Sequence, residues 1–281
     1  MVFPFIISTV ITTITVIQPI QDQHLTYGYF GNFPNKTFGS LLIPKTTPTP
    51  TPVLNLPQNQ TTKKHYTIAF LGDSMIDTLG NNFPEIDSAL STFFPRTTFT
   101  LLNYGVGATS IDTAINRIIL SYEYKGKIVP SVISQKPDLI IVESFAYNPY
   151  ADADGLTRYN RELVNLIRVL REKLPKTKII LATTIAPNSR IFADGAPGIS
   201  LTSNEKRERT TLIKQYLATA VSFAKTNGIP LANLYHVSID KNSDGNPIYI
   251  NNTDHIHYSA IGRMLFAQKI IETITANHLI E

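Results

Sequence analysis

Short apolar runs alternate with longer amphipathic segments from Tyr66 to the end of the chain, and this alternation restricts the fold more than any other feature. Apolar strands separated by helices are typical of a parallel sheet covered by helices on both faces. Five such strands predict a three-layer α/β/α sandwich with a flavodoxin-like strand order. The expected strands are residues 67–71, 99–103, 139–143, 178–183 and 230–234.

The segments between these strands have the composition and the period of helices. In residues 156–174, for example, Leu163, Ile167 and Leu170 fall on one face at helical spacing. The expected helices are residues 84–94, 111–122, 129–135, 156–174, 203–227 and 259–277.

Composition excludes several classes of protein. The chain has 281 residues, of which 43% are hydrophobic and 16% charged, so it can bury a sizeable core. It has no cysteine, which excludes disulfides, zinc–thiolate sites and a cysteine nucleophile. The net charge of +4 comes without a dense block of Lys and Arg, so we expect no nucleic-acid partner.

The N-terminal residues 2–20 are uncharged and allow three interpretations. Their length is close to the minimum for a membrane-spanning helix, which favours a membrane or signal anchor. A cleaved signal peptide is a second interpretation, although no Lys or Arg precedes the apolar run. The third is an ordinary strand, because Thr, Val and Ile favour β structure.

A Thr/Pro-rich stretch, residues 46–57, marks the clearest boundary in the chain. Alternating Thr and Pro favours an extended, semi-rigid backbone, and the alternative is an arm lying on the domain surface. We therefore expect an apolar segment and irregular arm over residues 1–45, a linker over 46–64, and the main domain over 65–281. A spacer behind an anchor predicts an exported, membrane-anchored or cell-envelope protein, with a cytoplasmic protein as the alternative.

The stretch from His65 to Leu79 contains the first candidate for chemistry. Its apolar run stops at Gly72-Asp73-Ser74, as a buried strand does when it turns sharply at its carboxyl end. In an open parallel sheet, ligands bind at that edge. Ser74 is therefore a candidate nucleophile, and the alternative is that Asp73 and Ser74 only cap a helix.

Asp254 and His257 provide the groups that a serine nucleophile needs. A serine attacks only if a base removes its proton, and the base needs a partner that orients it. Their spacing of three, just before an expected helix, can place the carboxylate against one imidazole nitrogen and leave the other for a serine. Alone, this spacing is more typical of a helix-capping Asp and a surface His.

Stabilising an oxyanion requires preorganised N–H donors, and two further strand ends offer them. After the second strand comes a loop with Gly105 and Gly107, where backbone N–H groups can approach a ligand closely. After the third strand, Asn148 offers a side-chain amide. Taken singly, each is explained by an ordinary turn.

Taken together, these motifs resemble the SGNH, or GDSL-type, hydrolase superfamily over about residues 65–277. Gly72-Asp73-Ser74 is similar to the block that carries the nucleophile, and Asp254-x-x-His257 is similar to the last block. The resemblance implies that Ser74, Asp254 and His257 are catalytic. It implies an oxyanion hole made by the N–H of Ser74, the N–H of Gly107, with the next residue as the alternative, and the amide of Asn148.

The resemblance implies an esterase that works through an acyl-enzyme and needs no cofactor or metal. Its expected substrate is a small-molecule or carbohydrate ester, such as O-acyl or O-acetyl groups on envelope carbohydrate. An acyltransferase on the same fold is one alternative, and a catalytically inactive glycan-binding domain is another. A nucleotide-binding protein is disfavoured because the first loop lacks a glycine series and a lysine.

Residues 240–245 have oxygen-bearing side chains at alternate positions, with a glycine in the sixth place, like the start of a calcium loop. The final carboxylate is missing, because Asn251 stands in its place. A polar turn in which Asp and Asn bond their own backbone is the alternative.

Overall fold

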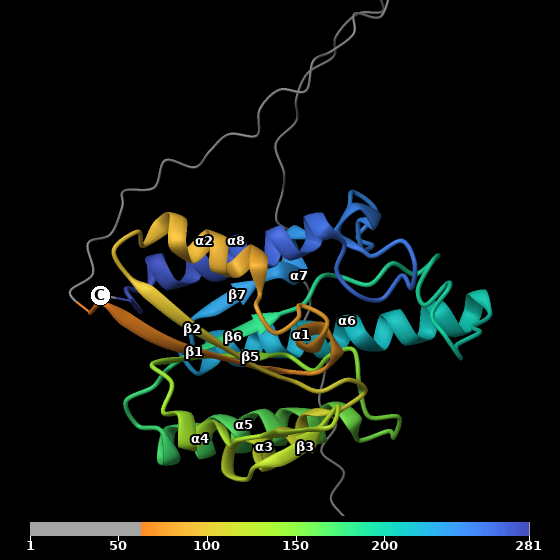
Figure 1. The fold of residues 1–281 in the computed structure, drawn as a ribbon. Helices are drawn as coiled ribbons and strands as arrows, with labels where there is room; N and C mark the ends of the chain where they lie inside the picture. Colours follow the sequence, from red (N-terminus) through yellow and green to blue (C-terminus); the bar gives the residue numbers. More distant parts are fainter. Residues whose placement is uncertain (1–62, 281) are drawn as a thin grey trace, which may run out of the picture. The chain divides into compact units, whose positions relative to one another are not determined.

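A computed structural model describes residues 63–280, which contain a five-stranded parallel sheet (Figure 1). The predictions for residues 2–20 and for nearly all of the Thr/Pro-rich linker lie outside the described residues. Within residues 63–280, no helix combines the length and the apolar character needed to cross a bilayer.

The strand order of the main sheet is β2-β1-β5-β6-β7, and all four neighbouring pairs are parallel. When these five strands are numbered one to five along the chain, their order in the sheet is 2-1-3-4-5, which is the flavodoxin-like order that the sequence predicts. The carboxyl ends of the strands therefore meet at one edge, where Gly72 of β1 lies opposite Gly105 of β2. The strands are β1 (His65–Gly72), β2 (Thr98–Gly105), β5 (Leu139–Glu143), β6 (Lys178–Thr183) and β7 (Leu231–Asn233).

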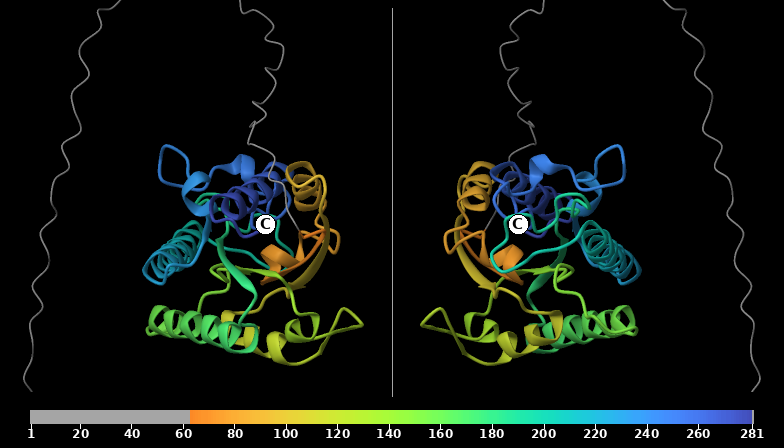
Figure 2. Two further views of the ribbon diagram at one scale, coloured as in Figure 1. Left: turned by 90° about the vertical axis from the view of Figure 1, so that its left-hand side faces the viewer. Right: turned by 90° about the vertical axis from the view of Figure 1, so that its right-hand side faces the viewer.

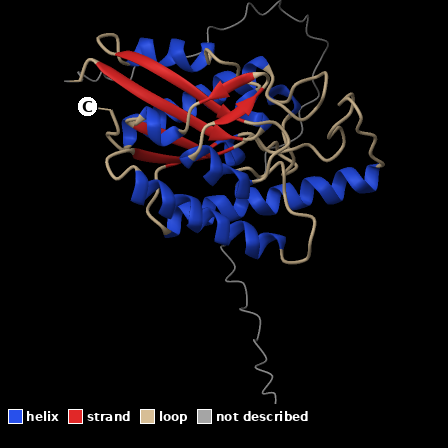
Figure 3. Ribbon diagram, turned by 60° about the horizontal axis from the view of Figure 1, so that its bottom comes forward, coloured by secondary structure: helices blue, strands red, loops and turns tan. Residues whose placement is uncertain are grey.

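Helices cover both faces of the sheet, as the side views show (Figures 2 and 3). α2 (Pro84–Phe93) and α8 (Ala260–Ala276) pack together on one face, and α5 (Gly155–Lys173) lies with α3 and α4 on the other. α6 (Ser203–Thr226) packs against α5 and contacts β6 and β7. The shorter helices are α1 (Ser74–Asp77), η1 (Ile111–Thr113), α3 (Ala114–Ile119), α4 (Val132–Gln135), α7 (Leu234–Val237) and η2 (Pro247–Tyr249).

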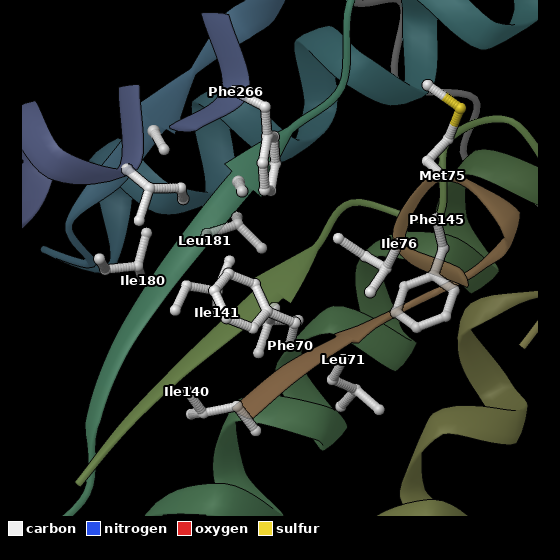
Figure 4. Packing of buried hydrophobic residues seen from close by; sticks show 14 of the residues in the cluster. Phe70, Leu71, Met75, Ile76, Ile140, Ile141, Phe145, Ile180, Leu181 and Phe266 are labelled. Atoms are coloured by element: carbon white, nitrogen blue, oxygen red, sulfur yellow. The ribbon is translucent and has the colours of Figure 1, made fainter. Parts of the chain in front are cut away.

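The core forms where the central strands are covered on both sides. Every residue of β5 is buried, because β5 lies between β1 and β6 under helices on each face. Figure 4 shows Phe70 and Leu71 on opposite sides of β1, so consecutive side chains contribute to both halves of the core. This burial explains why these strands are almost continuously apolar rather than alternating.

The prediction of helices over 111–122 and 129–135 is partly wrong. The first is a 3₁₀ turn followed by α3, which ends at Ile119, and the second begins only at Val132. Between them lies an antiparallel hairpin of β3 (Tyr122–Tyr124) and β4 (Lys127–Val129), outside the main sheet. Its turn, Lys125-Gly126, has positive φ at both residues, which favours a tight hairpin over a helix.

Candidate active site

Strand β1 passes directly into helix α1 at Gly72-Asp73-Ser74. Asp73 is the N-cap of α1, and its carboxylate accepts a 2.8 Å hydrogen bond from the backbone N–H of Met75. A side chain at position 72 is excluded, since an added Cβ would lie 2.3 Å from Cγ1 of Ile76. The tight turn leaves Ser74 as the first residue of α1, half-buried at the carboxyl edge of the sheet.

Asp254 and His257 form a carboxylate–imidazole pair just before α8. Nδ1 of His257 lies 2.8 Å from Oδ2 of Asp254. The other carboxylate oxygen accepts the backbone N–H groups of Ile256 and His257, at 2.9 and 3.0 Å, which fixes the carboxylate. With Nδ1–H donating to Asp254, Nε2 of His257 is an acceptor, and this buried atom has no hydrogen-bond partner among the described residues.

Asp254 is held in its charged form. Partial burial raises the pKa of this carboxyl, but the hydrogen bonds from the His257 ring and from two backbone N–H groups outweigh burial, so its pKa lies below the ordinary value. A charged Asp254 can orient the imidazole and stabilise the imidazolium that forms when His257 accepts a proton.

One cavity of about 690 Å³ brings the separate motifs together. Ser74 of α1, Asn148 after β5 and His257 before α8 all line it, although they are far apart along the chain. Its volume is within the range of small-molecule sites. Ser74 and His257 therefore line the same cavity, and no hydrogen bond joins Nε2 of His257 to the hydroxyl of Ser74 in this structure.

The candidate oxyanion donors differ in what they contact. Asn148 donates one amide N–H to Oδ2 of Asp73 at 2.7 Å, which fixes the amide and leaves its second N–H. The N–H of Gly107 donates to the hydroxyl of Tyr124 at 3.0 Å, and Gly107 is absent from the described residues that line the cavity. Ala108 does line it, in a left-handed conformation with φ of 56°.

Beneath the nucleophile turn lie two fully buried carboxyl groups, Asp73 and Glu143. Glu143 accepts hydrogen bonds from Ser144 Oγ (2.8 Å), from the N–H of Phe145 (2.7 Å) and from the N–H of Asp73 (3.3 Å). Burial, and then the charge of Asp73, raise the pKa of Glu143 well above its ordinary value. Burial also raises the pKa of Asp73, against hydrogen bonds from Met75 and Asn148. Glu143 is therefore the member of the pair that holds a proton.

Arg117 of α3 is also buried beside this pair, and the sequence analysis did not single it out. It donates hydrogen bonds of 2.7 Å to the backbone oxygens of Gly72 and Tyr104, near the ends of β1 and β2. Burial lowers the pKa of its guanidinium, while the nearby tyrosine and carboxyl groups act in the opposite direction. Arg117 thus ties together the two strand ends from which the site is built.

The Asp240–Gly245 segment has the contacts of a polar turn. Asp240 accepts the backbone N–H groups of Asn242 and Asp244, at 2.8 and 3.1 Å. Asp244 is paired with Lys214 at 2.7 Å and also accepts from Ser189. Over residues 63–280, no three or more His, Cys, Asp or Glu side chains are grouped as metal ligands would be.

The fold resembles that of several solved structures. A GDSL-like lipase from Bacteroides thetaiotaomicron is 16% identical with a TM-score of 0.54, and the match covers 75% of this chain and 89% of that one. The acetyl xylan esterase AlAXEase is 17% identical with a TM-score of 0.51, over 74% of this chain and 99% of that one. No protein-family model and no curated protein matches the chain. At this identity the likeness confirms the fold: the chain has the α/β fold of GDSL-type hydrolases.

Proposed function

We propose that the chain is a serine hydrolase that cleaves carboxylic esters through an acyl-enzyme. The observation that carries this proposal is that His257 lines the same cavity as Ser74, while Asp254 holds its Nδ1 and its Nε2 has no partner among the described residues. The GDSL-type fold and the lipase and esterase neighbours support the same reaction class.

In the first step, Ser74 Oγ attacks the ester carbonyl while Nε2 of His257 takes the hydroxyl proton. A C–O bond forms, the carbonyl π electrons move to oxygen, and the tetrahedral oxyanion results. His257 then gives its proton to the departing alcohol, which leaves Ser74 acylated. In the second step, His257 takes a proton from water as the water oxygen attacks the acyl carbon. The bond from that carbon to Oγ of Ser74 then breaks, His257 returns the proton to Oγ, and the acid leaves.

For the oxyanion we propose the N–H groups of Ser74 and Ala108 and the second amide N–H of Asn148. The sequence favoured Gly107 with its neighbour as the alternative. Ala108 is the better candidate because it lines the cavity, whereas the N–H of Gly107 is already bound to Tyr124. Three preorganised N–H donors stabilise the developing charge.

The alcohol part of the ester is proposed to be a carbohydrate or another small molecule. The support is the acetyl xylan esterase among the structural neighbours. The release of acetate from acetylated xylan and from acetylated monosaccharides measures activity on carbohydrate esters and so tests the proposed alcohol separately.

Activity of Ser74→Ala toward p-nitrophenyl acetate tests the reaction class. We expect kcat/KM to fall by at least about 10⁴-fold, because attack by the serine is the step that the variant lacks. Ser134→Ala, which removes a hydroxyl from α4 outside the cavity, is the matched control and should keep full activity. Unchanged hydrolysis by folded Ser74→Ala protein contradicts the proposal.

A further inference from the structure

One wall of the candidate active-site cavity is apolar. It is built from the segment between β6 and α6, from α6 itself and from the residue before His257. Phe192 is buried, whereas Ile199 is 45% exposed. The side chains of this apolar wall are Phe192, Ile199, Leu201, Leu212 and Ile256.

Among residues 63–280, four polar side chains other than the catalytic candidates line the cavity beside the apolar wall: Tyr147, Glu205, Glu208 and Arg209. The carboxylate of Glu205 accepts hydrogen bonds from the N–H and the hydroxyl of Thr202 and so caps α6. The hydroxyl of Tyr147 donates to the carbonyl oxygen of Ile185. Arg209 donates a 3.4 Å hydrogen bond to the carbonyl oxygen of Tyr147, and Glu208 precedes it on α6. The five side chains of the apolar wall carry no hydrogen-bonding group, so the wall itself offers only apolar contact.

We propose that the apolar wall binds an aliphatic chain of the ester. This inference rests on the proposed ester hydrolysis and deepens it. An apolar surface next to a reactive hydroxyl remains exposed to water unless an apolar chain covers it. Burial of each methylene group of that chain should raise the affinity about fourfold. An acetyl group would leave nearly all of the wall uncovered.

The chain can belong to the acid or to the alcohol, and two substrate series distinguish them. One series is p-nitrophenyl acetate, butyrate, hexanoate and octanoate, with a constant leaving group. The other is the acetates of ethanol, butanol, hexanol and octanol, with a constant acyl group. In one series kcat/KM should rise by about two- to fourfold per methylene until the wall is covered. A flat or falling profile in both series overturns the inference.

Two variants test whether the dependence of kcat/KM on chain length comes from the apolar wall. Leu212→Gln should lower kcat/KM for the preferred long-chain ester by tenfold or more and change the acetate value by less than twofold. Leu120→Gln makes the same change at an exposed position outside the cavity, so both values should stay constant. Equal behaviour of the two variants overturns the assignment to this wall. If Ser74→Ala keeps full activity, the reaction class itself has failed; if only the chain-length profile is flat, the inference alone has failed.

A second, independent observation concerns Tyr124 of the β3–β4 hairpin. Its hydroxyl accepts the N–H of Gly107 at 3.0 Å and donates to Oδ2 of Asp77 at 2.9 Å. Lys125 in the adjoining turn binds both oxygens of the same carboxylate, at 2.8 and 2.9 Å. Asp77 ends the short helix that begins with Ser74, and Gly107 directly precedes Ala108. One phenol thus joins the helix of the candidate nucleophile to the candidate oxyanion loop.

We infer that Tyr124 is a positioning residue for the proposed reaction, holding the N–H of Ala108 in place relative to Ser74. The two segments come from different strand ends, and the relay from Gly107 through Tyr124 to Asp77 fixes their separation. Donors that stabilise an oxyanion lose most of their effect when they are misplaced by about an ångström.

Tyr124→Phe removes both hydrogen bonds and keeps the ring. We expect kcat to fall by tenfold or more with KM changed by less than twofold, because the lost alignment acts on the transition state. Lys125→Met, which removes a largely exposed partner of the same carboxylate, should leave kcat within threefold. An unchanged kcat in Tyr124→Phe, or a rise in KM alone, overturns the inference, whereas an inactive parent enzyme contradicts the proposed function instead.

Discussion

Replacing Glu143 by Gln should make the stability of the protein less sensitive to alkaline pH. Glu143 is fully buried beside Asp73, and its pKa is raised well above the ordinary value of 4.5. Between that value and the raised pKa, the folded state holds a proton that the unfolded state has released. The folded state therefore loses stability as pH rises through this window, by about 1.4 kcal/mol per pH unit.

Gln has nearly the same shape as protonated Glu and does not titrate. It keeps an acceptor for the N–H of Phe145 and a donor toward the carboxylate of Asp73, but it loses the acceptor of the 3.3 Å hydrogen bond from the N–H of Asp73. That loss lowers stability equally at every pH, so the test is the slope of stability with pH and not its absolute value. The difference in unfolding free energy, variant minus parent, should increase by about 1.4 kcal/mol for each pH unit from about pH 5 upward. For a domain of this size that equals roughly 3–6 °C in Tm per pH unit.

Urea unfolding of parent and variant at several pH values measures this slope directly. Glu123→Gln, at an exposed position of β3, is the control and should give a curve parallel to that of the parent. Parallel curves for Glu143→Gln and the parent would refute the assignment of the proton to Glu143.

Three further substitutions, with Gly107→Ala as a control for the third, test the site and the packing that supports it. Asp254→Asn should lower kcat by about 10⁴-fold in the p-nitrophenyl ester assay, because an amide at this position favours the wrong imidazole tautomer; a loss below tenfold contradicts the pairing role. Asn148→Ala should lower kcat by about 10²–10³-fold in the same assay, and full activity would remove it from the oxyanion hole. Gly105→Ala should destabilise the fold by about 3 kcal/mol or more in urea, because its Cβ would lie 2.2 Å from the backbone nitrogen of Asp77. Gly107→Ala has room for its Cβ and should be nearly neutral, so equal effects of the two changes contradict the packing argument.

The central strands could be predicted because buried parallel strands have a distinctive composition. All five residues of Leu139–Glu143 are buried, and the sequence there is almost wholly apolar. The order of the strands followed from the alternation with helices, which restricts the connections between parallel strands. The main sheet could therefore be predicted from the composition of its strands together with their alternation with helices along the chain.

The β3–β4 hairpin could not be recognised in the same way. Its strands have three residues each and are mostly exposed, so burial leaves no apolar pattern in them. The Lys125-Gly126 turn was the available signal, but it is weak beside the neighbouring helical period. The importance of Tyr124 depends on contacts with Asp77 and Gly107, which are 47 and 17 residues away in the chain.

The candidate catalytic residues could be predicted from sequence motifs, whereas the buried charged residues that support them could not. Ser74, Asn148 and His257 are residue types that motifs mark, and the structure places all three around one cavity. Glu143 and Arg117 are charged residues that a sequence pattern assigns to the surface. Only the folded chain shows them buried beneath the nucleophile turn, where backbone and side-chain partners offset the loss of hydration.

The most direct test of the proposed triad is peptide mapping by mass spectrometry after reaction of the full chain with a fluorophosphonate. The expected result is a single phosphonate adduct on the peptide containing residue 74, formed far more slowly in His257→Ala protein. An adduct on another residue, or esterase turnover by protein that takes up no phosphonate, would contradict a nucleophilic serine activated by histidine and aspartate.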